Sequence, residues 1–391
     1  VLGEEGVTEV AAHAGGVVRY YVKMCDADNH VVREAGCQAV AELSQKLGTS
    51  PTHAPALEPY IHMLLQALIL CFYDESWPVR DEACIACGTF VRAYPTQCHP
   101  ELSQLYSLWI THLTDQIWSV RRDAAIAIGD AVIAYPDEIL PQALAEINKL
   151  LPSAKNQPAM TKEEYLALQN DLKSHTENQL YSCGSLAPKL KSGRHAGGCS
   201  DCVVNREKQP WEATDGCLYL ITELCCLGVD GDPAVDDKIV SLPPDVLDGL
   251  MTQVADVCRV NHFPQGDDIR CTLWKSLPRM AHGVGKKVFK RKYLDLFLDM
   301  LTRNATSRTA HRLSIHAAKV CLAELGAFVG EGILKGRIEM AGDCFDVDEL
   351  WRECQREMKE GGDNGGMMVD EGFGPFGPPG PQAAELMGRF P

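Results

Sequence analysis

The sequence has no long hydrophobic run. Its most apolar stretch, Ile61–Phe72, is interrupted by His62 and Gln66. A helix that crosses a bilayer needs about 20 consecutive, mostly apolar residues. We therefore expect no transmembrane segment. The chain begins at Val1, so a targeting peptide removed ahead of this residue stays open as an alternative.

Short enzyme motifs are also missing. The chain contains no GxxxxGK phosphate loop followed by Ser or Thr, no GxSxG nucleophile turn and no HExxH helix. These motifs supply phosphate binding, nucleophilic attack and zinc-assisted hydrolysis, respectively. Their absence favours a protein that is not an enzyme.

Regular cysteine spacing is absent although cysteine itself is abundant. The 17 cysteines are odd in number and irregularly placed, which argues against a disulfide framework. Several, such as Cys84 and Cys87, stand where a helix favours a small apolar residue, and this usage suits buried free thiols. We expect an intracellular, cytoplasmic protein, with a cilium or an organelle reached after removal of a transit peptide as alternatives.

Positive charge is scarce. The chain has 37 Lys and Arg against 53 Asp and Glu, a formal net charge of -16. An acidic surface repels the phosphate backbone, so general nucleic-acid binding is not expected. Other proteins, and basic segments of them in particular, are the expected partners.

An internal repeat occupies the first part of the chain. Residues 27–36, 74–83 and 115–124 align without gaps, and each copy contains a Val-Arg pair. The arginines are 47 residues (33 to 80) and 41 residues (80 to 121) apart, within the spacing of two-helix repeats. The last two copies stay in register as far as residues 88–95 and 129–136.

Each copy has the pattern of a helical hairpin. Apolar residues recur at three- and four-residue intervals over residues 57–73 and 102–113, which predicts the outer helices. The Asp ahead of each second helix can accept hydrogen bonds from free amide groups at its start. Ala and Gly in the second helices let neighbours approach closely, and Pro95 and Pro136 end them.

These segments resemble the HEAT-repeat family of armadillo-like proteins, well over residues 7–136 and weakly over 211–330. The resemblance implies an all-α fold, an α-solenoid of about five or six HEAT-type helical hairpins with one long irregular insertion. In this family an Asp and an Arg of successive repeats form a ladder along the stack. By resemblance, the ladder residues are Arg33, Asp74, Arg80, Asp115 and Arg121. Ala27 stands where the first Asp belongs, so we expect the ladder to be incomplete at that end.

The remaining chain divides by composition. We expect N-terminal HEAT repeats at 1–150, an irregular Cys- and Gly-containing insertion at 151–210, and more divergent HEAT-like repeats at 211–359. Within the last part, Trp211–Leu227 is predicted as an inner helix. The tail at 360–391 is rich in Gly, Pro and Met and cannot bury a core, so we expect it to be flexible.

The insertion holds the one candidate metal site. Cys199 and Cys202 have the spacing of half a zinc site, and His195 and Cys183 are candidates for the other ligands. Zinc is therefore a possible cofactor, and free thiols in a loop are the alternative.

Three further features are candidates for partner contacts. Trp77 and Trp118 occupy equivalent positions at the turns, where packing against adjoining helices is the alternative role. The one dense basic run contains Lys286, Lys287, Lys290, Arg291 and Lys292, and a solvated link between repeats is its alternative. Phe373 and Phe376 in the tail are candidates for a short docking motif.

The sequence therefore predicts a non-enzymatic protein-binding scaffold or adaptor subunit of a larger assembly. It would use the concave solenoid surface, together with the insertion and the tail. One alternative is a HEAT-type enzyme or lyase with a metal or tetrapyrrole in the groove. Deoxyhypusine hydroxylases bind iron through His-Glu pairs, and this chain contains no His-Glu dipeptide. Phycobilin lyases share only the fold, and a zinc-stapled structural component is the second alternative.

Overall fold

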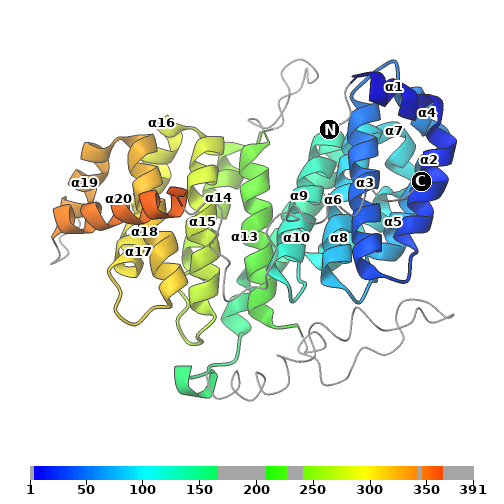
Figure 1. Ribbon diagram of the computed structural model, residues 1–391. Helices are drawn as coiled ribbons and strands as arrows, with labels where there is room; N and C mark the ends of the chain where they lie inside the picture. The colour runs from blue at the N-terminus through cyan, green and yellow to red at the C-terminus, as the bar shows by residue number, and fades with distance from the viewer. Residues whose placement is uncertain (1–3, 166–207, 228–240, 341–345, 364–391) are drawn as a thin grey trace. The chain divides into compact units, whose positions relative to one another are not determined.

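The computed structural model describes residues 4–165, 208–227, 241–340 and 346–363 (Figure 1). These residues form helices and contain no strand. They belong to two compact units, residues 1–297 and 298–391. This boundary lies inside the range 211–359 that the sequence assigned to one set of repeats.

The first unit is an α-solenoid of stacked helical pairs. In chain order its elements are α1 (Glu4–Ala12), α2 (Ala14–Cys25), α3 (His30–Gly48), α4 (Ala54–Leu57), η1 (Glu58–Tyr60), α5 (Ile61–Cys71), α6 (Trp77–Ala93), α7 (Pro95–Cys98), η2 (His99–Glu101), α8 (Leu102–His112), α9 (Trp118–Ala134), α10 (Pro136–Leu150), η3 (Leu151–Asn156), α13 (Pro210–Cys226), α14 (Pro244–Val257), α15 (Gly266–Val284), α16 (Lys286–Val288) and η5 (Phe289–Tyr293). Helix α17 (Leu294–Ala305) crosses into the second unit.

One layer consists of the inner helices α3, α6, α9, α13 and α15, each packed against the next (Figure 1). The outer helices α2, α5 and α8 pack against α3, α6 and α9, and α10 packs against α9 and α13. The stack follows from helical periodicity, because apolar residues three and four positions apart share a face. On α6 and α9 this face is fully buried and consists of Val79, Ala83, Ala86, Phe90, Val120, Ala124, Ala127 and Ala131.

Small residues set the spacing between inner helices. A Cβ atom added at Gly88 would lie 2.8 Å from the Cα atom of Ala127, so only glycine allows this approach of α6 to α9. The contact is closer still at Gly216 of α13, where an added Cβ would lie 1.8 Å from the carbonyl oxygen of Leu113. Larger side chains would push the layer apart.

The segment that the sequence assigned to an insertion starts in ordered structure. Residues 151–156 form the 3₁₀ helix η3, which packs against α13 and α14. Ordered structure therefore continues past Leu150, into the first residues of the segment expected to be an insertion. Helix α13 agrees with the inner helix predicted for Trp211–Leu227.

One stretch, Ala54–Cys71, is long and apolar enough to cross a membrane by length and composition, which the sequence reasoning did not expect. It comprises α4, η1 and α5, and 44% of it is buried. Leu64, Leu65 and Leu68 on α5 are fully buried in the stack. The core helix of a folded domain passes the same test, so the stretch is weak evidence for a membrane span.

The second unit contains α18 (Arg312–Val329), α19 (Glu331–Met340) and α20 (Val347–Asp363). Helix α18 packs against both others. Gly326 packs against the ring of Trp351. A Cβ atom added at Gly326 would lie 2.1 Å from this ring, so the ring fills the space that a side chain would need.

Candidate functional site: the turns and the inner-helix surface

Each ladder arginine holds the turn of its own repeat. Nη1 of Arg80 donates to the carbonyl oxygens of Asp74 at 2.9 Å and Glu75 at 3.2 Å. Arg33 makes the same contact with two carbonyls of its own turn, and Arg121 with one. These hydrogen bonds give carbonyl groups of the turn a partner.

The same arginines reach the next repeat. Arg33 donates from Nε and Nη2 to the two carboxylate oxygens of Asp74, at 2.6 and 2.7 Å. Arg80 donates from Nη2 to Asp115 at 3.4 Å. Each arginine therefore ties its own turn to the aspartate of the following turn.

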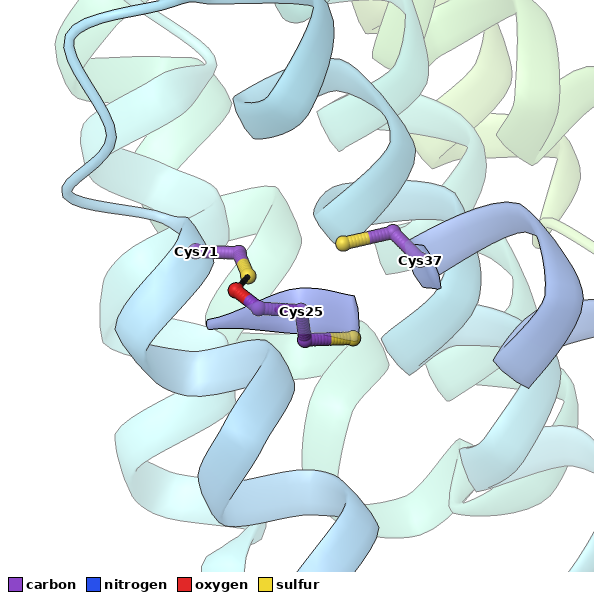
Figure 2. Close-up of side chains that lie close together, drawn as sticks. All are labelled: Cys25, Cys37 and Cys71. Atoms are coloured by element: carbon purple, nitrogen blue, oxygen red, sulfur yellow. Dashed lines mark hydrogen bonds between the residues drawn. The ribbon is translucent and has the colours of Figure 1, made fainter. Parts of the chain in front are cut away.

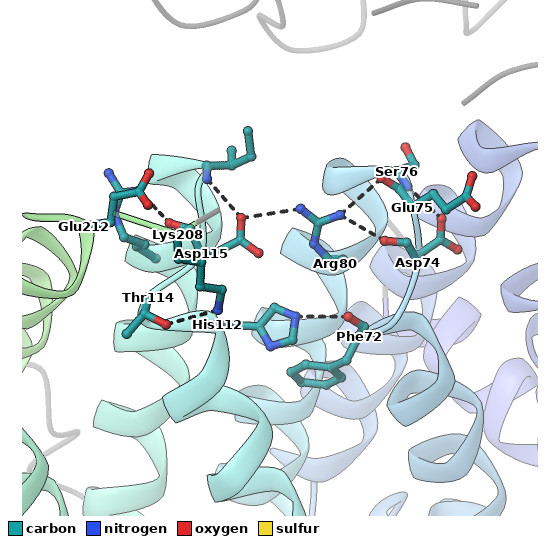
Figure 3. Close-up of polar contacts among 12 residues, drawn as sticks. Phe72, Asp74, Glu75, Ser76, Arg80, His112, Thr114, Asp115, Lys208 and Glu212 are labelled. Carbon is teal, nitrogen blue, oxygen red and sulfur yellow. Dashed lines mark hydrogen bonds and ion pairs between the residues drawn. The ribbon is translucent and has the colours of Figure 1, made fainter. Parts of the chain in front are cut away.

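Both turn aspartates also accept a backbone hydrogen bond. Asp74 accepts from the amide of Ser76 at 3.0 Å, and Asp115 accepts from the amide of Ile117 at 2.9 Å. These amides belong to the residues immediately before α6 and α9, so each aspartate fixes the turn that leads into its helix and does not cap the first helical amides. Figure 3 shows Asp74, Arg80 and Asp115 in line across the two turns.

The ladder continues beyond α9 with a different acceptor. Arg121 donates from Nε and Nη2 to the same carboxylate oxygen of Asp215, at 2.9 and 2.7 Å. Its Nη1 also lies 4.0 Å from Glu212, and its guanidinium faces the ring of Trp211 at 5.3 Å. Arg121 is buried, and burial lowers the pKa of its guanidinium. The charge and hydrogen bonds of Asp215, together with Tyr219 and Glu212, outweigh burial and raise this pKa.

A change of residue at the turn explains the new acceptor. Trp211 aligns with Trp77 and Trp118, and the position three residues earlier holds Asp74, Asp115 and, in this repeat, Lys208. A lysine cannot accept from Arg121. Asp215, one helical turn after Trp211, supplies the carboxylate instead.

Lys208 binds the preceding repeat. Its Nζ donates to the carbonyl oxygen of Thr111 at 2.8 Å and to Oγ1 of Thr114 at 3.0 Å (Figure 3). Burial lowers the pKa of Lys208, while Asp115 and Glu212 act in the opposite direction.

Thr214 takes the position that arginine holds in the other repeats. Its hydroxyl donates to the carbonyl oxygen of Leu151 at 2.8 Å and accepts from the amide of Ala154 at 2.8 Å. These bonds fix η3 against α13. The polar contacts of this repeat therefore hold the start of the inserted segment.

His112 links two outer helices. Its Nε2 lies 3.0 Å from the carbonyl oxygen of Phe72, and its Nδ1 lies 2.8 Å from that of Leu108 (Figure 3). Burial lowers the pKa of His112, while these carbonyls and Asp115 oppose that effect. A neutral imidazole has one N–H and serves only one of the two carbonyls.

A row of carboxylates crosses the inner helices beside the ladder. We call Glu34, Asp81, Glu82, Asp123 and Asp268 the inner-helix carboxylate row; these residues lie on α3, α6, α9 and α15. Burial and then Glu82 raise the pKa of Glu34, and burial raises the pKa of Glu82. Burial, followed by Asp215 and Asp267, raises the pKa of Asp268 to about 7.

The strongest effect is at Asp81. Burial and the neighbouring Asp123 raise the pKa of Asp81 to about 8, while Ser119 and Arg122 oppose the shift. Arg122 donates from Nε to Asp123 at 2.7 Å. Oδ1 of Asp81 is buried without a hydrogen-bond partner. With a pKa of about 8, Asp81 is mostly protonated at neutral pH and would ionise when a cation arrives beside it.

The other predicted site residues are placed as follows. Trp77 and Trp118 begin α6 and α9 and are half-buried, and the ring of Trp118 faces the Arg122 guanidinium at 5.1 Å. The basic run forms α16 and η5, and Lys292 pairs with Asp248 at 2.9 Å. Residues Cys183, His195, Cys199, Cys202, Phe373 and Phe376 lie outside the described residues.

Sequence reasoning missed Lys208, Asp215 and the carboxylate row. The alignment of Trp211 with Trp77 and Trp118 was the available signal for Lys208. Asp215 has no such signal, because no other repeat uses an aspartate one turn after the tryptophan as the ladder acceptor. The row depends on which acidic residues of different helices become neighbours.

No known protein family matches the chain, and no curated protein matches it. Among solved structures, one match is a chain from the complex in which Kap95p binding induces the switch loops of RanGDP to adopt the GTP-bound conformation. The two chains are 13% identical with a TM-score of 0.33, and the match covers 90% of this chain. This chain spans 41% of the length of the chain it matches.

Proposed function

We propose that the protein is a non-enzymatic scaffold whose inner-helix carboxylate row binds a basic segment of a partner protein. The observation that carries the proposal is the placement of Glu34, Asp81, Glu82 and Asp123 on three neighbouring inner helices, α3, α6 and α9. Burial and mutual repulsion there raise the pKa of Asp81 and Glu34, and burial raises the pKa of Glu82. Carboxylates held near one another and away from water favour the arrival of a cation. Lysine or arginine side chains of a partner would supply it.

The charge and the architecture support the same proposal. A net charge of -16 attracts basic partners from a distance. Stacked inner helices present a long, regular surface, which suits an extended peptide. The described cysteines are free thiols, which supports our proposal of an intracellular, reducing compartment.

A peptide-binding measurement tests the proposal. Fluorescence anisotropy would compare a labelled Lys- and Arg-rich peptide with one of the same length in which Gln replaces each basic residue. We expect only the basic peptide to bind. A cation beside Asp81 favours its ionised form, so binding would release protons and tighten as pH rises from 6 to 8.

The control is a variant matched in charge. Glu34→Gln, Asp81→Asn and Glu82→Gln together remove three ionisable carboxyl groups from the row. Asp137→Asn, Glu138→Gln and Glu146→Gln remove three charges from α10. We expect about tenfold weaker peptide binding for the first variant and less than about twofold for the second. Equal losses would show that net charge alone attracts the peptide and would contradict the proposed site.

A further inference from the structure

Three cysteines from three helices meet in the core of the first unit. Cys25 is the last residue of α2, Cys71 is the last residue of α5, and Cys37 lies within α3. All three are fully buried. Their sulfur atoms lie within 4.8 Å of one another (Figure 2).

The thiols already contact one another and the backbone. Sγ of Cys71 donates to the carbonyl oxygens of Ala67 at 3.4 Å and Cys25 at 3.6 Å. Hydrogen bonds with Cys25 and Cys71, together with burial, raise the pKa of Cys37 well above its usual range. In the metal-free protein the thiol of Cys37 is therefore protonated.

The spacing of the sulfur atoms fits a metal ion at their centre. A zinc–sulfur bond is about 2.3 Å long, which places the three sulfurs of a trigonal site about 4.0 Å apart. A triangle whose sides are at most 4.8 Å reaches that geometry if each sulfur moves inward by no more than about 0.5 Å. Rotation of the cysteine side chains supplies such a movement without a shift of the helices.

We propose that Cys25, Cys37 and Cys71 form a three-thiolate site for a thiophilic metal ion, Zn²⁺ or Cu⁺. Thiolate ligands select these soft ions over Mg²⁺ and Ca²⁺, which prefer oxygen. Among the described residues this is the one group of His, Cys, Asp and Glu whose ligand atoms meet in this way. It is separate from the cysteines of the insertion.

Metal binding would join the first helical pair to the second. Cys25 and Cys37 belong to the α2–α3 pair, and Cys71 belongs to α5 of the next pair. Each thiol that becomes a ligand releases its proton to solvent, so one bound ion releases up to three protons and binds more weakly at low pH. A metal link would therefore stabilise the packing of these two pairs.

The test uses the full chain, reduced and stripped of metal. Zn²⁺ alone and Cu⁺ alone, the latter without oxygen, are added to separate samples, and bound metal is measured after gel filtration. Wild type is expected to retain one equivalent more than Cys37→Ser, Cys37→Ala or Cys71→Ser. The ion retained identifies the metal, and X-ray absorption would give three sulfur ligands.

Two control variants test whether the loss of bound metal is specific to the three clustered cysteines. Cys217→Ser removes another fully buried cysteine of the same unit, and Cys199→Ser with Cys202→Ser removes the candidate ligands of the insertion. In Cys217→Ser we expect all of the wild-type metal to be retained. The insertion variant is expected to keep the equivalent that Cys37→Ala loses. Circular dichroism checks that each variant is folded. The proposal would be overturned if wild type and the Cys37 and Cys71 variants held equal amounts of metal. It would also be overturned if two of the three cysteines formed a disulfide that resists the reductant.

Discussion

Arg121 and Asp215 form a buried ion pair between residues 94 positions apart in the sequence. The pair joins α9 to α13 across the inserted segment. Both side chains are 2% exposed, so water cannot replace either partner. The stack therefore depends on this contact where the regular ladder of turn aspartates ends.

Removal of one partner should destabilise the first unit strongly. We expect Arg121→Met to lower the free energy of unfolding by about 3–5 kcal/mol, because Asp215 would remain charged and buried. Lys155→Met, which breaks the exposed pair with Asp256, should cost less than about 1 kcal/mol. Urea denaturation measures both. If the double variant Arg121→Met/Asp215→Leu were no more stable than Arg121→Met, the unpaired charge would not be the cause.

The close approach at Gly216 gives a second prediction. Gly216→Ala places a Cβ atom 1.8 Å from the carbonyl oxygen of Leu113. Because the backbone must move to make room, we expect the free energy of unfolding to fall by at least about 3 kcal/mol. Gly249 on α14 has no atom within 4 Å of an added Cβ. Gly249→Ala should stabilise the protein by about 0.5–1 kcal/mol through helix propensity. Thermal unfolding measures the melting temperature of each variant. Similar shifts in melting temperature for the two variants would refute the packing argument.

Asp81 should make stability depend on pH. Its pKa is about 8 in the folded protein and about 4 when unfolded. Between these values the folded state binds more protons, so the free energy of unfolding falls as pH rises from 4 to 8 and then levels off. We expect Asp81→Asn to flatten this fall and to be more stable than wild type by about 1–3 kcal/mol at pH 8. Chemical unfolding across the pH range measures the effect. Asp137→Asn, at an exposed position of α10, should leave the profile unchanged.

His112 should act in the opposite sense. Because burial lowers its pKa in the folded protein, the unfolded state binds more protons below pH 6.5, and stability falls on acidification. His112→Gln should remove this fall in stability. It should also lower the free energy of unfolding at pH 7 by about 1 kcal/mol, since glutamine keeps one of the two contacts with carbonyls. Titration of His112 by nuclear magnetic resonance checks the direction. A folded pKa above 6.5 would mean that the two carbonyls and Asp115 outweigh burial.

Local patterns predicted the helical elements of this protein. Apolar residues at three- and four-residue intervals determine which face of a helix is buried, and this needs no knowledge of distant residues. The buried residues Val79, Ala83, Ala86 and Phe90 follow such a pattern. Asp74 and Asp115 likewise accept from amides two residues later in the chain, which is a local contact that the turn sequence indicates.

The carboxylate row and the cysteine cluster could not be predicted in this way. Glu34, Glu82 and Asp123 belong to three different inner helices, and each alone looks like an ordinary polar residue of a helix. Their mutual repulsion exists only once the helices stack. Cys25, Cys37 and Cys71 likewise read singly as small buried residues.

The sequence by itself determined that this chain forms helical pairs, where the first three turns lie and which arginines serve them. Only the tertiary structure decided that Asp215 partners Arg121, that Lys208 binds Thr111 and Thr114, and that three sulfur atoms converge. The physical reason is the distance along the chain over which each interaction acts. Helix periodicity and capping act over a few residues, whereas these pairings depend on which helices become neighbours and how closely glycine lets them approach.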